Sequence, residues 1–142
     1  MVLMFQKELA DRICADSGSK AYGIPSVLVN MYTLCTCELN IPRQCFYPQP
    51  KVDSSVLKMI VRKEPHIDLK DHDFFNRIVK IAFAKRRKTL MNNLKVLLKG
   101  GYSEEALHEA LENSGIDSNR RGETLTAVEY GLLSNALLKK YS

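Results

Sequence analysis

Residues 52–83 read VDSSVLKMIVRKEPHIDLKDHDFFNRIVKIAF, and the hydrophobic period changes within this stretch. From Val52 onward polar and apolar residues alternate, with Ser55, Leu57, Met59 and Val61 on one side, which predicts a half-buried β-strand. Residues 63–73 combine charges with a proline and have no period, which is typical of a linker. Apolar residues then recur at helical spacing from 75 to 83. The stretch predicts an α+β chain of two units, residues 1–64 and 65–142.

The first unit contains three further expected elements. The apolar run at 2–5, VLMF, predicts a buried strand, and residues 7–14 a short helix. After a loop rich in glycine and serine, Ser26 is expected to cap a helix from Val27 to about Cys35.

The second unit is expected to be all-helical. The helix that begins near Phe75 places its basic residues, Arg77, Lys80 and Arg87, opposite its apolar stripe. Further helices are predicted at 89–98, at 104–113 and after Thr126, where TAVE has the spacing of a capping box.

Charge is distributed unevenly along the chain. The 21 Lys and Arg against 16 Asp and Glu give a formal net charge of +5. Eight basic residues and no acidic one fall between Phe74 and Lys99, whereas four glutamates fall between Ser103 and Glu112. A basic face on this unit indicates a polyanionic partner.

Several classes of protein are disfavoured by what the sequence lacks. No apolar run is long enough for a membrane span, and the four cysteines do not have zinc-site spacing. Free thiols fit a reducing cytoplasm. The sequence has neither a glycine-rich nucleotide loop nor a triad-like arrangement, and its three histidines fall in the linker or on charged surface. No metal site is expected.

The segment 46–51, FYPQPK, is the first candidate site. Pro48 and Pro50 fix the backbone and remove two hydrogen-bond donors, so the segment is expected to present its side chains from a stiff loop. Phe46 and Tyr47 either plug the edge of a core or offer a ring on which a base turned out of its helix can stack.

The segment 85–89, KRRKT, is the second candidate site. Four consecutive cations suit a solvated helix end, where they complement the helix dipole. The absence of acidic neighbours, together with the separate pair Arg120 and Arg121, favours phosphate binding instead.

Several segments together resemble the KsgA-type small-subunit rRNA adenine N6,N6-dimethyltransferases. They are LMFQKELADRI (3–13) with SKAYG (19–23), FYPQPKVDSSV (46–56), FAKRRKTLMNNL (83–94) and GIDSNRRGETLT (115–126). The proline-rich motif also occurs in related 23S rRNA enzymes, whereas the QKE, SKAYG and RRKT segments differ there. The resemblance implies that residues 1–64 are the C-terminal portion of a Rossmann-like class I methyltransferase domain. It implies that residues 65–142 are a small helical bundle that binds rRNA.

The resemblance also assigns roles to residues. Phe46 corresponds to the aromatic residue that packs against the target adenine, and Pro48 would help to form the same wall. The residues expected to contact rRNA are Lys51, Arg77, Lys80, Arg86, Arg87, Lys88, Arg120 and Arg121. The S-adenosylmethionine site and the catalytic motif of such enzymes lie in the other half, so this chain is expected to bind no cofactor and to be inactive alone.

Two functions remain open at this point. The chain is part of a transferase that dimethylates two adjacent adenines of small-subunit rRNA during ribosome biogenesis in the cytoplasm, acting on the pre-30S particle. Alternatively, it is a non-catalytic RNA- or ribosome-binding module. In either case unpaired strands are expected to favour self-association.

Overall fold

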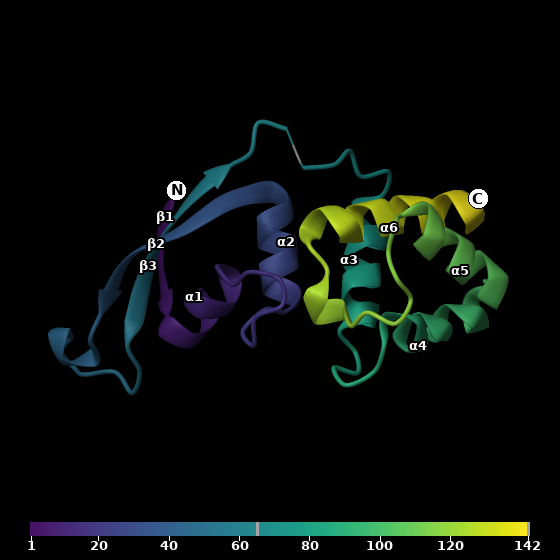
Figure 1. Ribbon diagram of the computed structural model, residues 1–142. Coiled ribbons are helices and arrows are strands. Elements are labelled where there is room, and N and C mark those ends of the chain that lie inside the picture. Colours follow the sequence, from purple (N-terminus) through teal and green to yellow (C-terminus); the bar gives the residue numbers. More distant parts are fainter. Residues whose placement is uncertain (65, 142) are drawn as a thin grey trace.

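The computed structural model describes residues 1–64 and 66–141, in which a three-stranded antiparallel sheet is joined to a group of helices. The sheet and the short helix α1 lie at one end of an elongated molecule, α3 to α6 form the other end, and α2 lies between them (Figure 1). The predicted mixture of helix and sheet is confirmed. The predicted boundary between the two units falls at Pro65, which lies outside the described residues.

The sheet contains β1 (Val2–Gln6), β2 (Thr33–Ile41) and β3 (Ser54–Val61) in the order β1-β3-β2. The strand expected from Val52 is β3, which begins two residues later. The strand is half-buried, as predicted: Ser55, Leu57 and Met59 on one side are buried, whereas Val61 at the end of the strand is 66% exposed.

The expected burial of the segment 2–5 is wrong. These residues form β1, but Val2 and Met4 are 64% and 55% exposed. β1 pairs only with β3 among the described strands, and its register places these two side chains on the face opposite Leu57. That open face carries an apolar set made of Val2, Met4, Leu34, Leu39, Val56 and Ile60.

One helix precedes the glycine- and serine-rich loop and another follows it. The predicted first helix is α1 (Lys7–Ile13). The second, α2 (Ile24–Tyr32), begins earlier than predicted, because Gly23 is the N-cap residue. Ser26 lies inside the helix, where its Oγ accepts a hydrogen bond from the Gly23 N–H at 3.0 Å and donates one to the Arg12 carbonyl.

Strand β2 is not predicted by the sequence. Residues 33–35, assigned to the end of a helix, begin this strand instead, and the helix ends at Tyr32. Tertiary context decides here, because β2 pairs along β3 from Thr33↔Val61 to Ile41↔Ser54 with one irregularity between Cys37 and Leu39.

The helix predicted near Phe75 is α3 (His72–Ala82), which Asp71 caps by accepting a hydrogen bond from the Phe74 N–H at 3.0 Å. Its apolar stripe is buried as predicted. The helix does not extend to Arg87, because Asn93 caps its end: the Asn93 Nδ2 donates to the carbonyls of Ala82 and Lys85 at 2.9 and 3.1 Å. Residues 85–88 therefore form a turn rather than a helix end.

The remaining helices follow the predicted pattern closely. The segment 89–98 divides into α4 (Leu90–Leu94) and a 3-10 helix, η2 (Lys95–Gly100), while α5 spans Glu104–Asn113 as expected. α6 (Ala127–Tyr141) begins with the predicted capping box. The Thr126 N–H donates to Glu129 Oε1 at 3.1 Å, and the Glu129 N–H donates to Thr126 Oγ1 at 3.2 Å. Two short 3-10 turns, η1 (Arg43–Cys45) and η3 (Gly122–Thr124), complete the described elements.

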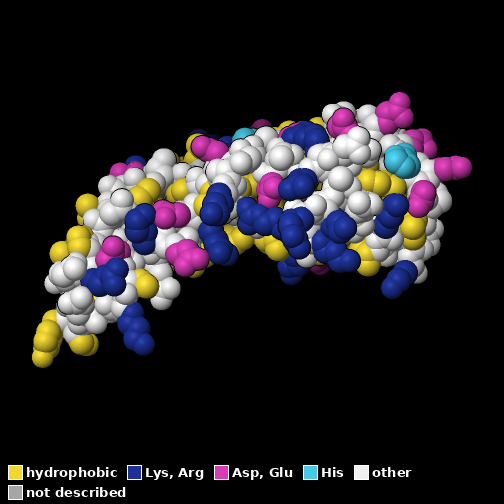
Figure 2. Space-filling model, turned by 60° about the horizontal axis from the view of Figure 1, so that its bottom comes forward, with side chains coloured by type: hydrophobic (Ala, Val, Ile, Leu, Met, Phe, Trp, Pro, Cys, Tyr) yellow, Lys and Arg dark blue, Asp and Glu magenta, His cyan; other side chains and the backbone are white. Residues whose placement is uncertain are grey.

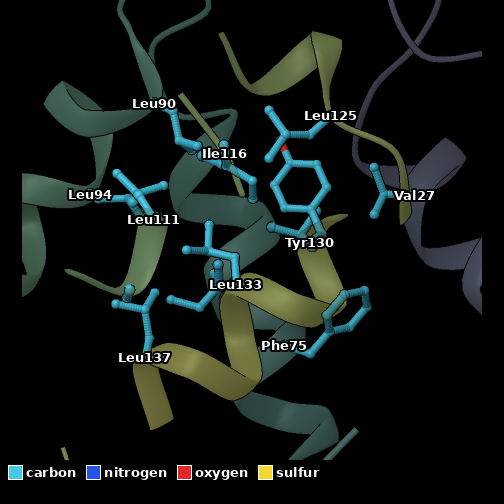
Figure 3. Close-up of a cluster of buried hydrophobic side chains, with 14 of the residues drawn as sticks. Val27, Phe75, Leu90, Leu94, Leu111, Ile116, Leu125, Tyr130, Leu133 and Leu137 are labelled. Carbon is cyan, nitrogen blue, oxygen red and sulfur yellow. The ribbon is translucent and has the colours of Figure 1, made fainter. Parts of the chain in front are cut away.

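One large hydrophobic core spans both predicted units. Phe75, Leu90, Leu94, Leu111, Leu133 and other side chains from the helices surround Tyr130 (Figure 3). Val27 and Met31 of α2 belong to the same cluster and are fully buried. A smaller cluster of Ala10, Ile13, Leu57 and Met59 lies between α1 and the sheet, with Val29 of α2 packed against it. Helix α2 thus contributes to both cores.

Candidate nucleic-acid interface

The proline-rich loop is held closed by Arg43 and Asp53. The Arg43 backbone N–H and Nε donate to Asp53 Oδ1 at 2.9 and 3.1 Å, and its Nη1 donates to the Lys51 carbonyl at 2.7 Å. Hydrogen bonds from the Arg43 backbone and side chain lower the pKa of the Asp53 carboxyl. The loop therefore has a fixed backbone, as its two prolines predict, and the Tyr47–Pro48 peptide bond is cis.

The two aromatic rings of this loop have different surroundings. Phe46 is half-buried and lines a shallow cavity of about 270 Å³ with Met4, Pro48 and Pro50, while Tyr47 is fully exposed beside it. Phe46 is thus partly packed and partly available to a ligand in this cavity, so its stacking role stays a prediction. The Lys51 side chain is exposed on the same loop.

The cations of the turn 85–88 are not equivalent. The Arg86 guanidinium pairs with Glu123 at 2.8 Å and donates to the Lys20 carbonyl at 2.6 Å. Arg87 and Lys88 are exposed, and within the described residues neither side chain makes a hydrogen bond or an ion pair. Arg86 fastens the turn to neighbouring segments, and its two neighbours are left facing solvent.

Arg120 and Arg121 differ in the same way. Arg120 donates through both terminal nitrogens to the Glu129 carboxylate, and also to Thr124 O at 2.6 Å and Thr124 Oγ1 at 3.2 Å. Burial opposes ionisation of Glu129, but the hydrogen bonds from Arg120 and Thr126 outweigh it and lower its pKa. Arg120 therefore ties the η3 region to α6, whereas Arg121 is exposed.

The other two predicted phosphate contacts, Arg77 and Lys80, are exposed on α3 and line a basic groove with Lys85. The proline-rich loop lies at the sheet end of the molecule, away from α3 and α4 (Figure 1). The structure therefore separates the candidate residues into the proline-rich loop at one end and a basic surface on the helices. The helix-spacing pattern alone did not identify Lys95 and Lys99, which line the groove from η2.

Residues 1–64 and 66–141 contain no group of three or more Asp, Glu, His or Cys side chains placed to hold a metal ion, and none of their helices is long and apolar enough to cross a membrane. His72 stacks on Tyr32, with 2.8 Å between Nδ1 and Oη. The four cysteines are free thiols, with the Sγ atoms of Cys14 and Cys35 at 3.0 Å.

The family model of "Ribosomal RNA adenine dimethylase" matches residues 1–131. The chain belongs to this family. Among curated relatives, "Ribosomal RNA small subunit methyltransferase A" of Oceanobacillus iheyensis is 41% identical over the whole chain, and that of a Geobacillus strain is 46% identical over 96% of it. The chain covers 48% and 47% of these two proteins, and so spans about half their length.

Two solved structures share this fold. A dimethyladenosine transferase from Plasmodium falciparum superposes with a TM-score of 0.83 at 25% identity, covering 99% of this chain and 57% of that one. The 23S rRNA methyltransferase ErmE superposes with a TM-score of 0.63 at 19% identity, covering 96% of this chain and 53% of that one, which shows a common fold only.

Proposed function

We propose that this chain is part of an S-adenosylmethionine-dependent rRNA adenine N6,N6-dimethyltransferase. The whole enzyme would act on two adjacent adenines of small-subunit rRNA in the pre-30S particle, during ribosome biogenesis in the cytoplasm. The observation that carries the proposal is the match of one rRNA dimethylase family along residues 1–131, with relatives named as small-subunit methyltransferases that align over the whole chain. A non-catalytic module is not favoured, because these relatives are methyltransferases.

The same correspondence suggests a different role for each of the two units of the chain. Residues 1–64 would be the C-terminal strands and helices of a Rossmann-like methyltransferase domain, and residues 65–142 the rRNA-binding helical domain. One observation supports placing the S-adenosylmethionine site elsewhere: β1 passes directly into α1 at Gln6–Lys7, without the glycine that lets a backbone approach a nucleoside closely. The cofactor would be bound by residues of the whole enzyme outside this chain, and the chain alone would be inactive.

Phe46 and Pro48 would form one wall for the target adenine. N6 of a stacked adenine cannot be reached, so the base must leave its helix and be held between flat surfaces. Stacking on an aromatic ring contributes roughly 1–3 kcal/mol per base. The half-buried ring of Phe46 in its shallow cavity, on a loop closed by Arg43 and Asp53, is suited to this task.

The rRNA backbone would be held by exposed cations: Lys51, Arg77, Lys80, Arg87, Lys88 and Arg121. Arg86 and Arg120 belong to the same surface, but their guanidinium groups already have protein partners, so their role would be to position the segments that carry Arg87 and Arg121. Contacts of this kind set register on the RNA more than sequence.

The open face of the sheet is the basis for proposing self-association of the isolated chain. Large side chains such as Leu34 and Leu39 are 55% and 56% exposed there. Exposed apolar patches and unpaired strand edges recruit partners, so a second copy of this chain would cover the face. Light scattering should show concentration-dependent dimers, and Leu34→Lys with Leu39→Lys should shift the population to monomers; a monomer at all concentrations would contradict the idea.

Replacing the corresponding part of the Oceanobacillus relative with this chain tests the enzymatic proposal. The chimera should form dimethyladenosine in small-subunit rRNA, whereas the 142-residue chain alone with S-adenosylmethionine should form none. Phe46→Ala in the chimera should lower methylation and leave overall RNA affinity nearly unchanged, since one stacked base is a small part of a charged interface. Tyr47→Ala is the matched control for loss of an exposed ring. Full activity of the Phe46 variant would mean that this ring only packs the loop.

A further inference from the structure

A groove of about 580 Å³ runs between α3 and the α4–η2 segment. Dark blue Lys and Arg side chains gather across the helical part of the molecule on the face shown in Figure 2. The groove's lining includes no acidic side chain. Five cations surround it: Arg77, Lys80, Lys85, Lys95 and Lys99.

Most of these cations are available to a ligand. Arg77, Lys80 and Lys99 are exposed, as is Lys85, and no hydrogen bond or ion pair engages their side chains within the described residues. Lys95 is the exception, with its Nζ 3.8 Å from a carboxylate oxygen of Glu104. The four cations of the groove that are unpaired within the described residues differ in this respect from Arg86 and Arg120, whose guanidinium groups already have protein partners.

The floor of the groove is apolar. Ile81, Ala84 and Val96 lie between the cations, and Val96 is 51% exposed. The groove also has a fixed width at one end, because the buried Asn93 of α4 bonds two carbonyls at the end of α3. A preformed channel with cations along both walls and an apolar floor matches a strand with charged phosphates on its outside and carbon-rich sugars between them.

We propose that this groove binds the sugar–phosphate backbone of one rRNA strand, with phosphates on Arg77, Lys80, Lys85 and Lys99 and riboses against Val96. The inference rests on the proposed function and assigns the main phosphate contacts to the groove rather than to the arginine pairs of the two loops. No aromatic side chain lines the groove, so bases would not be stacked there and binding would be largely independent of sequence.

The test compares two triple variants of the 142-residue chain that remove the same charge. The groove variant is Lys80→Gln, Lys85→Gln and Lys99→Gln, and the control is Lys58→Gln, Lys63→Gln and Lys70→Gln, whose lysines are also exposed. Binding to a single-stranded transcript of small-subunit rRNA is followed by fluorescence anisotropy over a series of KCl concentrations. Circular dichroism confirms that each variant is folded.

The groove variant should bind at least about tenfold more weakly. The slope of its log affinity against log salt concentration should fall by about 0.7 for each lost contact, or about 2 in all. The control should change both quantities much less. Val96→Asp, at an exposed position, should also weaken binding, whereas Val96→Leu should not.

Four results would overturn the inference. Equal losses in both triple variants would mean that only the overall charge matters. Unchanged RNA binding by the groove variant, with weakened binding of a poly-glutamate peptide, would make the groove a site for acidic protein segments. If the unmodified chain binds no rRNA, the proposed function fails together with the groove assignment. If the unmodified chain binds rRNA and the groove variants bind it equally well, the groove assignment alone fails.

Discussion

Met31→Ala tests whether helix α2 is part of the helical core. Met31 is fully buried, and its methyl group would lie 3.2 Å from a β-carbon built on Gly131 of α6. The substitution removes three heavy atoms, each comparable to a methylene worth about 0.8 kcal/mol when buried. The transfer term is therefore about 2.4 kcal/mol, and a residual cavity raises the expected loss within the range of about 2–5 kcal/mol for such changes.

Met4→Ala is the matched control. It makes the same chemical change on β1, where the side chain is 55% exposed, and should lower the free energy of unfolding by less than about 0.5 kcal/mol. Urea unfolding of both variants, followed by circular dichroism at 222 nm, gives the two differences. If Met31→Ala is no more damaging than Met4→Ala, α2 does not stabilise the helical core.

Gly131→Ala adds a second measurement at the same contact. A β-carbon at this position would lie 3.2 Å from the end of Met31, so Met31 must move by a few tenths of an ångström, and the cost of this shift opposes the gain in helix propensity from Gly to Ala. In the Met31→Ala background the added methyl group finds room, and part of this cost should be recovered as a coupling energy of about 0.5–3 kcal/mol. Strict additivity of the two changes would refute the packing of α2 against α6.

Further predictions concern packing, acid stability and thiol reactivity. Gly122→Ala should lower the free energy of unfolding, measured with urea, by about 1–3 kcal/mol, because its β-carbon would lie 2.7 Å from the Ala82 carbonyl oxygen at the end of α3. Gly100→Ala is the control and should lower it much less, because a β-carbon there has no atom within 4 Å. The pKa of Glu129 is lower in the folded chain than its unfolded value of about 4.3, so ionised Glu129 stabilises the fold above about pH 4.3, and this stability is lost as the pH falls through the folded pKa. Glu129→Gln should therefore lower Tm at pH 7, and the Tm of this variant should decrease less between pH 5 and pH 3 than that of the unmodified chain. Burial and the hydrogen bond with its neighbouring thiol raise the pKa of Cys14 to about 12, so iodoacetamide at pH 8 should alkylate exposed Cys37 well before Cys14, and equal rates by mass spectrometry would contradict this.

The sequence predicted best those elements whose signals are local. The capping residue Thr126 and the buried stripe of α3 are fixed by side chains within one or two helical turns, and α5 has the predicted limits. The N-cap Asp71 was not predicted, because residues 63–73 read as a linker. Strand β2 was missed because residues 33–41 acquire their conformation from pairing with β3, which lies more than ten residues away in sequence. The exposure of β1 was also missed, because apolar composition does not tell whether anything covers a strand's second face.

The candidate site shows the same limit at the level of single side chains. Arg86 and Arg87 are adjacent and chemically identical, yet one is bonded to Glu123 and the other is exposed. Their partners come from segments distant in sequence, so a basic run can indicate a polyanion surface without showing which cations are available. Lys99 was counted in the basic run but not chosen as a contact, because its position across from α3 depends on the path of η2.

Helix α2 gives the two parts of the candidate interface a fixed spacing. Val29 packs against the core beneath the sheet that carries the Phe46 loop, while Val27 and Met31 are buried among the helices that form the basic groove. If the groove holds the rRNA backbone and the loop receives the adenine, α2 helps to set the separation of these two contacts on the RNA, together with the bonds of Lys20 and Tyr22 to the helices. Recognition would then depend on the distance between a phosphate run and an exposed base, which is a property of RNA shape. Loosening α2 should weaken methylation by a chimeric enzyme even where each contact residue is intact.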